Sequence, residues 1–587
     1  MKWKLGLFLF PVLSVHCLAD VKVSEDTVVH RIHNHLLIKD EGAAIEEARH
    51  FLSTHSSLQD FHFKQVQMAY LEALCRKGEE VEALDRYSLI FSKEENEKDR
   101  KLLLEWLAWG VLGKGEGSPL LLIRLYSLMG ASFTQDARAI PVLLRELRGS
   151  NAFLRSLAVK LSMHYGDAPL QDELLRLLKE EKVWFVRLEV IKAVGALRIE
   201  KAKSLLQDIL IQTRALAEER GAAILSLLSM CDKVTKEELS YLLQSNRAGL
   251  RHLASEIIAH LNLEEEVESL IPLLEDSSPD VRISAMNTLG LLRVKELKGI
   301  PVASYVRKNL AANIPSISIT AAWLMTILGD LEGVEKLKGW IEGDDLEAKR
   351  MGAAALAASG PFGVNLSLEE IKKQKDLYTK VNLAVGLIGL RKELKLSSEV
   401  LFQAIVDSED SLWMWDTGGN PLFRSLMPSK VRHIDEIPRY PLVVDQLAKL
   451  EIFSILSILK YPNALVAVKK FLKHQDASIS GTAAMILLQE GDETVLDLIK
   501  ELLSDPDEQI RVQAALILAL MGSDPSAASV LIDAYSKVGR DMKLHILEAI
   551  GRIGDPSTMP FLLEVLKEPF QGLRVVAASA LIQCLYH

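Results

Sequence analysis

Hydrophobic residues recur along most of the chain at the three- and four-residue spacing of an α-helix, in short stretches separated by polar turns. Val495 to Leu503 and Val512 to Leu520 are two such stretches. This spacing places the apolar side chains on one face of a helix. The pattern therefore predicts an all-α protein in which short helices pack in pairs.

The helices repeat with a period of about 31 residues. In Pro279 to Ala285, Asp507 to Ala514 and Gly572 to Ala577, a turn is followed by an apolar residue, an arginine and, three residues later, an alanine. We call the position of this arginine the anchor. One step between anchors spans 69 residues and the others 30 to 36. The anchors are Arg155, Arg187, Arg220, Arg251, Arg282, Ser318, Arg350, Lys380, Lys449, Ser480, Arg511, Lys543 and Arg574.

A second marker, a glycine with an aspartate one or two residues later, lies eleven residues after several anchors. Glycine ends a helix by adopting the left-handed conformation, and aspartate caps the next helix. A unit of two short helices cannot bury its apolar face alone, so the units must stack on one another. We therefore expect an α-solenoid of antiparallel helix pairs. The marker glycines are Gly166, Gly329, Gly491, Gly522 and Gly554.

These residues resemble the HEAT-repeat family, in particular the bacterial repeats grouped with phycobiliprotein lyases. The signature is Asp-x-x-Val-Arg-x-x-Ala followed by Leu-Gly-x-x-x-Asp, and Pro279 to Leu291 and Asp507 to Asp524 match it best. The resemblance extends over about residues 137–587. It implies hydrogen bonds from the anchor arginines to turn aspartates, which form a ladder between repeats. Members of the family serve as scaffolds, as adaptors and in a few cases as enzymes.

The chain divides into five segments on this reading. Residues 20–136 form an N-terminal helical cap without the anchor, either diverged HEAT repeats or tetratricopeptide-like pairs, in which 113–118 is a linker between helices. We expect five tryptophans on apolar helical faces to pack in the core: Trp106, Trp109, Trp184, Trp323 and Trp340. The other segments are a signal peptide (1–19), the HEAT-repeat solenoid (137–407), an irregular insertion loop (408–441) and the C-terminal repeats (442–587).

The insertion loop coincides with the 69-residue step between Lys380 and Lys449. Thr417-Gly418-Gly419-Asn420-Pro421 interrupts the expected helix, and Pro428, Pro438 and Pro441 prevent its resumption. The sequence predicts a protruding loop rich in residue types common at binding hot spots. Alternatively, Trp413 and Trp415 pack inward and replace lost core. The partner-binding candidates are Trp413, Trp415, Phe423, Arg424, Arg432, His433, Arg439 and Tyr440.

The first nineteen residues have the layout of a secretory signal peptide. Lys2 and Lys4 precede an apolar run from Leu5 to Val15, and Cys17-Leu18-Ala19 stands before Asp20. We expect cleavage after Ala19 and export to the periplasm or beyond, where the protein is soluble or peripheral to the membrane. A lipoprotein modified at Cys17 and a cytoplasmic protein with a fortuitous start are the alternatives.

The net charge and the cysteine and histidine residues indicate which partners and metal sites to expect. The chain of 587 residues has 69 basic and 79 acidic residues, and nucleic-acid binding through phosphate contacts needs a basic face, so we expect no nucleic-acid partner. Cys75, Cys231 and Cys584 show no zinc spacing and are expected to be buried thiols. His30, His33 and His35 lack a second ligand cluster, so we interpret them as surface histidines and expect no metal site.

The sequence contains no His-Glu dipeptide of the kind that HEAT-like di-iron hydroxylases repeat, and no nucleophile elbow. We therefore predict no catalytic residues and no cofactor. The predicted function is an exported, non-enzymatic scaffold or adaptor that binds a protein or peptide on the solenoid surface. Its acidic net charge favours a partner with a basic patch. The alternative is a HEAT-like lyase or another cofactor-modifying enzyme.

Overall fold

The computed structural model describes residues 25–54, 61–91, 96–407, 413–416, 419–428, 440–462, 464–471, 481–486, 494–521 and 524–586. Within these ranges the secondary structure is helical apart from two short hairpins. The first hairpin joins β1 (Glu296–Leu297) to β2 (Ile300–Pro301). The predicted all-α solenoid is therefore confirmed.

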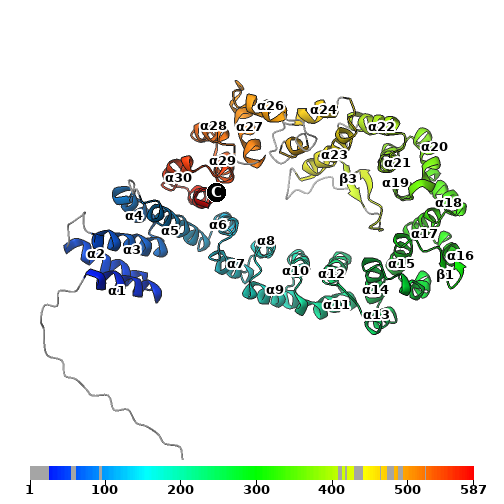
Figure 1. Ribbon diagram of the computed structural model, residues 1–587, viewed down its shortest axis with the longest axis horizontal. Coiled ribbons are helices and arrows are strands. Elements are labelled where there is room, and N and C mark those ends of the chain that lie inside the picture. The colour runs from blue at the N-terminus through cyan, green and yellow to red at the C-terminus, as the bar shows by residue number, and fades with distance from the viewer. Residues whose placement is uncertain are drawn as a thin grey trace, which may run out of the picture.

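Each repeat places one helix on the outer side of the solenoid and one on the inner, concave side (Figure 1). The outer elements are α7 (Ala139–Leu147), α9 (Ala168–Glu180), α11 (Lys203–Ile211), α13 (Lys236–Leu243), a 3-10 segment (Glu264–Glu275), α16 (Val302–Leu310), α18 (Leu331–Glu342), α20 (Val364–Lys373), α22 (Leu394–Asp407), α24 (Ala464–Phe471), α26 (Thr494–Leu502), α28 (Ser526–Tyr535) and α30 (Met559–Val565).

With one exception, the anchors in the described ranges lie near the start of an inner helix, so the register read from the sequence is that of the structure there. The exception is Lys449, which lies in the middle of α23. The inner helices are α8 (Ala152–Ser162), α10 (Trp184–Ala196), α12 (Ala217–Ser229), α14 (Ala248–His260), α15 (Pro279–Leu291), α17 (Pro315–Ile327), α19 (Leu346–Ala357), α21 (Leu377–Gly389), α23 (Tyr440–Ile458), residues 481–486, α27 (Glu508–Met521), α29 (Arg540–Ile553) and α31 (Gln571–Tyr586).

The N-terminal cap is helical as predicted and branches off the repeats. Gly113 and Gly115, expected in a linker, lie inside α5, and the chain leaves the helix only at Gly117. The cap helices are α1 (Glu25–Leu37), α2 (Glu41–Thr54), α3 (Phe61–Lys77), α4 (Glu80–Arg86, continued by a π-helical turn to Phe91), α5 (Glu97–Glu116) and α6 (Leu121–Phe133).

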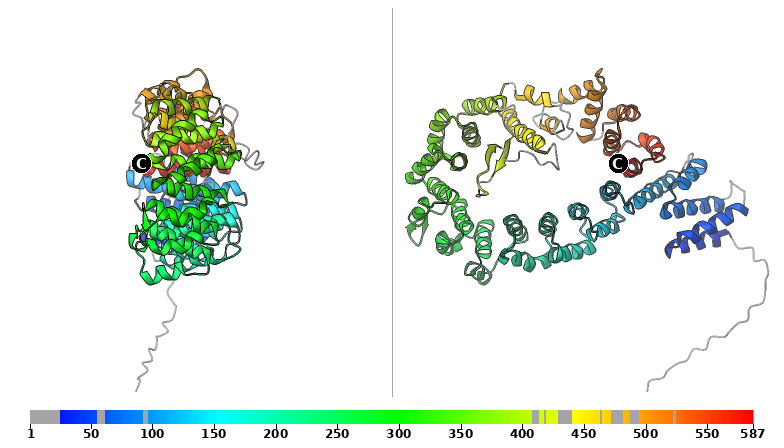
Figure 2. Two further views of the ribbon diagram at one scale, coloured as in Figure 1. Left: turned by 90° about the vertical axis from the view of Figure 1, so that its right-hand side faces the viewer. Right: turned by 180° about the vertical axis from the view of Figure 1, so that it is seen from behind.

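The solenoid closes into a ring, because α31 packs against α5 and α6 as well as against α29 (Figures 1 and 2). Two glycines allow this close approach. A Cβ atom on Gly115 would lie 2.9 Å from Val575, and one on Gly130 would lie 2.9 Å from Ser579. The repeats thus enclose a lumen, and α1 to α4 project outside it.

The anchor ladder that the resemblance implied is present in several repeats. Arg251 donates two hydrogen bonds to Asp276, at 2.6 and 2.7 Å, and Arg350 binds Asp376 in the same way. Burial alone would raise the pKa of Asp276, but the hydrogen bonds from Arg251 and the Ser278 amide, together with the charges of Arg251 and Arg282, outweigh it and lower that pKa. Arg251 and Arg350 thus each tie their repeat to the turn about one repeat later, whereas Arg220 and Arg511 donate to carbonyl oxygens of the turn just before their own helix.

The last anchor completes the ladder across the ring closure. Arg574 has no following repeat, and its guanidinium instead donates to Glu80 at 3.0 Å. The Glu80 side chain is 5% exposed, and Lys114 lies 3.8 Å from it. The cap thereby supplies the carboxylate that a further repeat would have supplied.

Candidate functional site

The insertion between α22 and α23 forms a hairpin that lies across the concave side of the ring. β3 (Trp413–Asp416) pairs antiparallel with β4 (Ser425–Pro428), and Trp413 stands opposite Pro428. The hairpin packs against α19, α21 and α23 and reaches toward α15 and α17 (Figure 1). The expectation of an irregular, protruding loop is therefore wrong for the described residues 413–416 and 419–428.

Aromatic side chains hold the hairpin on the inner helices. The ring of Trp413 lies 6.0 Å from that of Tyr378 on α21, and the ring of Phe423 lies 5.7 Å from that of Trp323 on α17. Trp413 is 0% exposed and Phe423 is 2% exposed. These two predicted binding residues therefore fill the interface between hairpin and wall, where a partner cannot reach them.

Three asparagines satisfy the polar groups that the hairpin buries. Asn382 on α21 accepts a hydrogen bond from the Leu426 amide at 2.7 Å and donates to the Leu426 carbonyl at 3.3 Å. Asn420 donates to Thr320 at 2.8 Å and exchanges 3.0 Å hydrogen bonds with Asn287. A side chain of an inner helix thus forms hydrogen bonds with the backbone of an extended segment.

All these contacts come from three positions of the repeat, which we call the wall positions: two residues before the anchor, two after it and five after it. Tyr378 occupies the first, Thr320 and Asn382 the second, and Asn287 and Trp323 the third. The wall positions therefore mark the part of each inner helix that faces a segment bound on the concave side.

The other predicted binding residues are placed differently. Trp415 is half-buried and donates to Glu451 at 2.6 Å, and the guanidinium of Arg424 lies 4.7 Å from the Trp415 ring. Arg432, His433 and Arg439 lie outside the described residues, as does the side chain of Tyr440, which begins α23. Among the described candidates, only Trp415 and Arg424 combine with each other on an accessible surface.

The inner helices α8, α10 and α12 border the lumen, and no described segment lies across them (Figure 1). Phe153 is 55% exposed and Leu225 is 69% exposed. Neither is shielded in the way that Tyr378 and Trp323 are. We call this surface the bare wall. Its positions hold Phe153, Phe185 and Glu218; Leu157, Glu189 and Ala222; and Lys160, Lys192 and Leu225.

On α8 and α10, the basic side chains of the bare wall are exposed, and the acidic side chain that pairs with them is shielded. The ammonium groups of Lys160 and Lys192 lie 3.8 and 3.2 Å from the same Glu189 carboxylate. Both lysine side chains are more than 50% exposed, whereas that of Glu189 is 16% exposed. A segment that approaches α8 and α10 therefore meets lysine and apolar side chains first, and the acid that pairs with the lysines lies behind them. On α12 the segment also meets the exposed Glu218.

Glu256 on α14 lies between the bare wall and the part that the hairpin covers. Ser284 donates to its carboxylate at 2.6 Å, and His252 Nε2 lies 3.4 Å away. Burial tends to raise the pKa of Glu256, but the hydrogen bonds from His252 and Ser284 outweigh it, and the net pKa is lowered. Glu256 is therefore a charged, bonded group at the border between the two surfaces.

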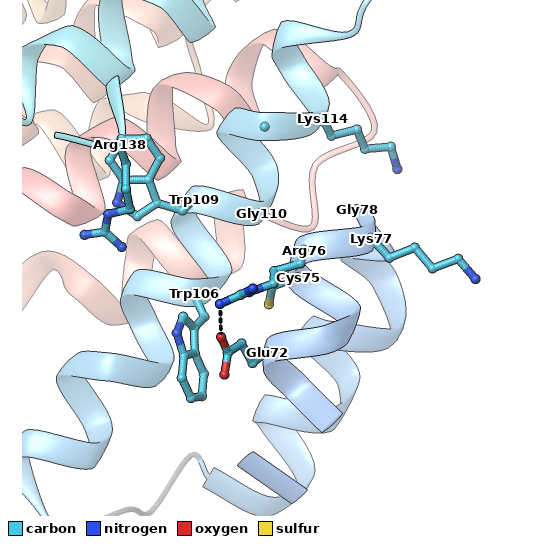
Figure 3. Close-up of a pocket in the computed structure, with 11 residues that line it drawn as sticks. Glu72, Cys75, Arg76, Lys77, Gly78, Trp106, Trp109, Gly110, Lys114 and Arg138 are labelled. Carbon is cyan, nitrogen blue, oxygen red and sulfur yellow. Dashed lines mark ion pairs between the residues drawn. The ribbon is translucent and has the colours of Figure 1, made fainter. Parts of the chain in front are cut away.

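A separate groove of about 400 Å³ lies between α3, α5 and the turn before α7 (Figure 3). Trp106 and Trp109 line it from α5, with the Arg138 guanidinium 4.7 Å from the Trp109 ring. Arg76 pairs with Glu72 at 2.5 Å on the facing side, and Lys77 and Lys114 extend at the open end. We call this feature the cap groove.

Sequence reasoning missed the cap groove because it placed Trp106 and Trp109 in the core, and it missed the bare wall because it did not compare equivalent positions of the repeats. Trp323 is buried as expected, but Trp184 is 55% exposed and Trp106 and Trp109 are half-buried at the cap groove. The signal that could have revealed the bare wall is the repeat register itself. Five residues after the anchor, the sequence has Lys160, Lys192 and Leu225 and only later the asparagine and tryptophan that the hairpin covers.

The described cysteines and histidines were predicted to be buried thiols and surface histidines, respectively. Cys75 and Cys584 are buried and Cys231 is half-buried, all without a disulfide, and burial raises the pKa of the Cys75 thiol. His30 and His33 are exposed on α1. Across the described ranges no cluster of three or more histidine, cysteine or acidic side chains could hold a metal ion, and none of the helices there is long and apolar enough to span a bilayer.

Comparisons with known proteins agree with the repeat. The family model for HEAT repeats matches residues 465–543 and 497–582. No curated protein matches the chain. Similar solved structures include the complex of CpcE and CpcF of phycocyanin lyase from Nostoc sp. PCC7120, with 17% identity over 45% of this chain and 93% of that chain and a TM-score of 0.26.

Two further structures span more of the chain. Kap121p is 12% identical over 94% of this chain and 81% of its own, with a TM-score of 0.34. Kap95p, solved in a complex with RanGDP, is 11% identical over 93% of this chain and 87% of its own, with a TM-score of 0.35. The match over residues 465–582, together with the anchored helix pairs, shows that this chain contains HEAT repeats.

Proposed function

We propose that this protein is a non-enzymatic scaffold that holds an extended segment of a partner protein against the bare wall of its ring. The observation that carries the proposal is the hairpin. It binds at the wall positions of α15 to α21, and the same positions on α8, α10 and α12 stand open with Phe153 and Leu225 exposed. Large exposed apolar side chains grouped on one surface are typical of protein interaction sites.

The chemistry of the bare wall suits a segment that combines apolar and acidic side chains. Phe153 and Leu225 offer apolar contact, and the exposed ammonium groups of Lys160 and Lys192 attract carboxylates. Because the acidic side chain of Glu189 is shielded, it repels such a segment less than an exposed acid would. The acidic net charge of the whole chain thus does not describe this surface.

The proposal includes export. The arrangement of Lys2, the apolar run and Ala19 before Asp20 supports a cleaved signal peptide, with the ring acting in the periplasm or outside the cell. Sequencing the N-terminus of the protein purified from its source cells tests this part. A first residue of Asp20 supports it, and retention of Met1 contradicts it.

Photo-crosslinking in the source cells tests the scaffold. A photoreactive phenylalanine analogue at Leu225 is expected to give one dominant covalent adduct with another protein. The matched control is the same analogue at Tyr241, which is 71% exposed on the outer helix α13. Adducts that are equal at both positions, or missing at Leu225, contradict the proposal.

The substitution Leu225→Asp provides the complementary test. It places a carboxylate where we expect an apolar contact and should abolish the adduct formed from a second photoreactive residue at Phe153. Because Leu225 is exposed, the substitution should leave the helical circular dichroism unchanged.

A further inference from the structure

We propose that the cap groove is a second binding site, which takes a peptide segment with acidic side chains around an apolar one. The groove lies on the cap, outside the lumen, and shares no residue with the bare wall (Figures 1 and 3). The inference therefore does not depend on the function proposed above.

The floor of the groove is aromatic. Trp106 and Trp109 are three residues apart on α5, so both indoles project from one face of that helix. Nearby, α3 and α5 touch, because a Cβ atom on Gly110 would lie 2.7 Å from the Cys75 carbonyl oxygen. Beyond this contact Gly113 also lines the groove, and a Cβ atom there would meet nothing within 4 Å. The floor thus has open space above it for an apolar side chain.

The rim of the groove is cationic where a ligand would meet it. The side chains of Arg76, Lys77, Lys114 and Arg138 are between 41% and 48% exposed. Three carboxylates that pair with them, on Glu72, Glu80 and Glu105, are 10% exposed or less, whereas Asp136 beside Arg138 is 31% exposed and Glu79, 4.0 Å from Lys77, is 52% exposed. At Arg76 and Lys114 a ligand therefore contacts the cation and not the acid beneath it, and its carboxylates complement this part of the rim.

One of these cations is fixed in position. Arg138 donates two hydrogen bonds to Asp136, at 2.9 and 2.7 Å, which hold its guanidinium over the Trp109 ring. A carboxylate that binds there gains a charge-assisted hydrogen bond to a donor that is already oriented. The cap groove thereby pairs an aromatic floor with oriented cations, which is the complement of alternating apolar and acidic side chains.

Binding of a short, capped, fluorescent peptide of alternating glutamate and leucine tests the inference. With the chain from residue 20 to 587, we expect saturable fluorescence anisotropy that weakens as salt is added. Replacing the glutamates by glutamines is expected to lower affinity by about tenfold or more, because the charge-assisted contacts are lost. Equal affinity of the two peptides would overturn the proposal, and this comparison requires no variant.

The substitution Gly113→Leu locates the site. The Cβ atom of the new side chain would meet nothing within 4 Å, and leucine in a helix interior is more favourable than glycine. We expect binding to fall at least tenfold. The matched control is Gly339→Leu on the outer helix α18, where a Cβ atom also meets nothing within 4 Å, and it should bind normally.

Two further results separate this site from the lumen. The double variant Lys77→Ala, Lys114→Ala should also weaken peptide binding, because it removes two cations of the rim. It tests the site even if Gly113→Leu does not fold. Leu225→Asp on the bare wall should leave peptide affinity unchanged. If Leu225→Asp abolishes binding while Gly113→Leu does not, the peptide binds in the lumen and the cap groove is not its site.

Discussion

The covered and bare parts of the concave wall use the same three repeat positions for opposite purposes. On α15, α17 and α21 they hold the neutral polar residues Asn287, Thr320 and Asn382, which are 4% exposed or less. On α8 and α10 they hold Lys160, Glu189 and Lys192. Neutral side chains can be buried with their hydrogen bonds satisfied, whereas charged ones are costly to bury. The wall positions thus decide where the chain binds its own hairpin and where it stays open.

The largest effect is expected when one aromatic residue is truncated in each part of the wall and the stabilities of the two variants are compared. Trp413→Ala removes a fully buried side chain from the hairpin interface and should lower the free energy of unfolding by about 3–5 kcal/mol. Phe153→Ala on the bare wall should change it by about 0.5 kcal/mol or less, because that ring is already 55% exposed. Urea unfolding followed by circular dichroism measures both.

Limited proteolysis provides a second comparison of the variants Trp413→Ala and Phe153→Ala. Loss of the Trp413 contact with Tyr378 should expose the hairpin, so cleavage between residues 408 and 439 should accelerate in Trp413→Ala. Phe153→Ala should keep the cleavage pattern of the wild-type chain. Equal stability of the two variants would show that the hairpin does not depend on the wall.

The second prediction concerns the closure that makes the two parts face each other across one lumen. Arg574→Ala leaves the shielded carboxylate of Glu80 without its closest cation and should cost about 3 kcal/mol, since Lys114 at 3.8 Å compensates only in part. Small-angle X-ray scattering should then report a larger radius of gyration as the ring opens. Arg282→Ala is the control, because Asn309 at 3.4 Å is its side-chain partner and the ring should stay closed.

The third prediction uses pH at the border between the two parts. The pKa of Glu256 in the folded chain lies below its ordinary value of 4.5, so its ionised form stabilises the fold above that pH. This contribution should be lost as the pH falls through 4.5 toward the folded pKa. Glu256→Gln should flatten the dependence while retaining a partner for Ser284, and unfolding measured between pH 7 and pH 3.5 would detect the difference. An unchanged slope contradicts the assignment.

Local sequence information predicted the repeat accurately because each repeat is specified by nearby residues. Apart from Lys449, the described anchors lie near helix starts as the sequence predicted. Gly329 and Gly554 have the expected positive φ, whereas Gly166 does not. The hairpin was missed because the proline-rich segment was interpreted only as a barrier to a helix. Its signal was present, since Trp-Met-Trp-Asp and Ser-Leu-Met-Pro flank a turn that contains Gly419.

Ring closure and the two candidate surfaces could not be predicted in this way. Closure depends on small rotations that accumulate over all the repeats. Gly115 and Gly130 become meaningful only once α31 reaches them. Whether Trp323 or Trp184 is covered likewise depends on a segment that lies far away in the sequence.

The smallest predicted effect concerns the position eleven residues after the anchor, which is left-handed after α10 in the bare part of the wall and after α17 and α21 in the covered part. Gly329 occupies it with φ of 88°, but Arg198 after α10 and Arg391 after α21 occupy it with φ of 51° and 53°. A non-glycine residue pays a steric penalty of about 1–2 kcal/mol there, which the extra flexibility of unfolded glycine partly offsets.

Arg391→Gly should therefore stabilise the chain by about 0.5–1 kcal/mol, because the arginine is exposed and the left-handed conformation is relieved. Arg198→Gly should gain slightly less, since it also loses the exposed ion pair with Asp232 at 2.5 Å. Gly329→Ala should have the opposite sign. Urea midpoints of the three variants measure these effects, and a destabilised Arg391→Gly would mean that backbone entropy outweighs steric relief at this position.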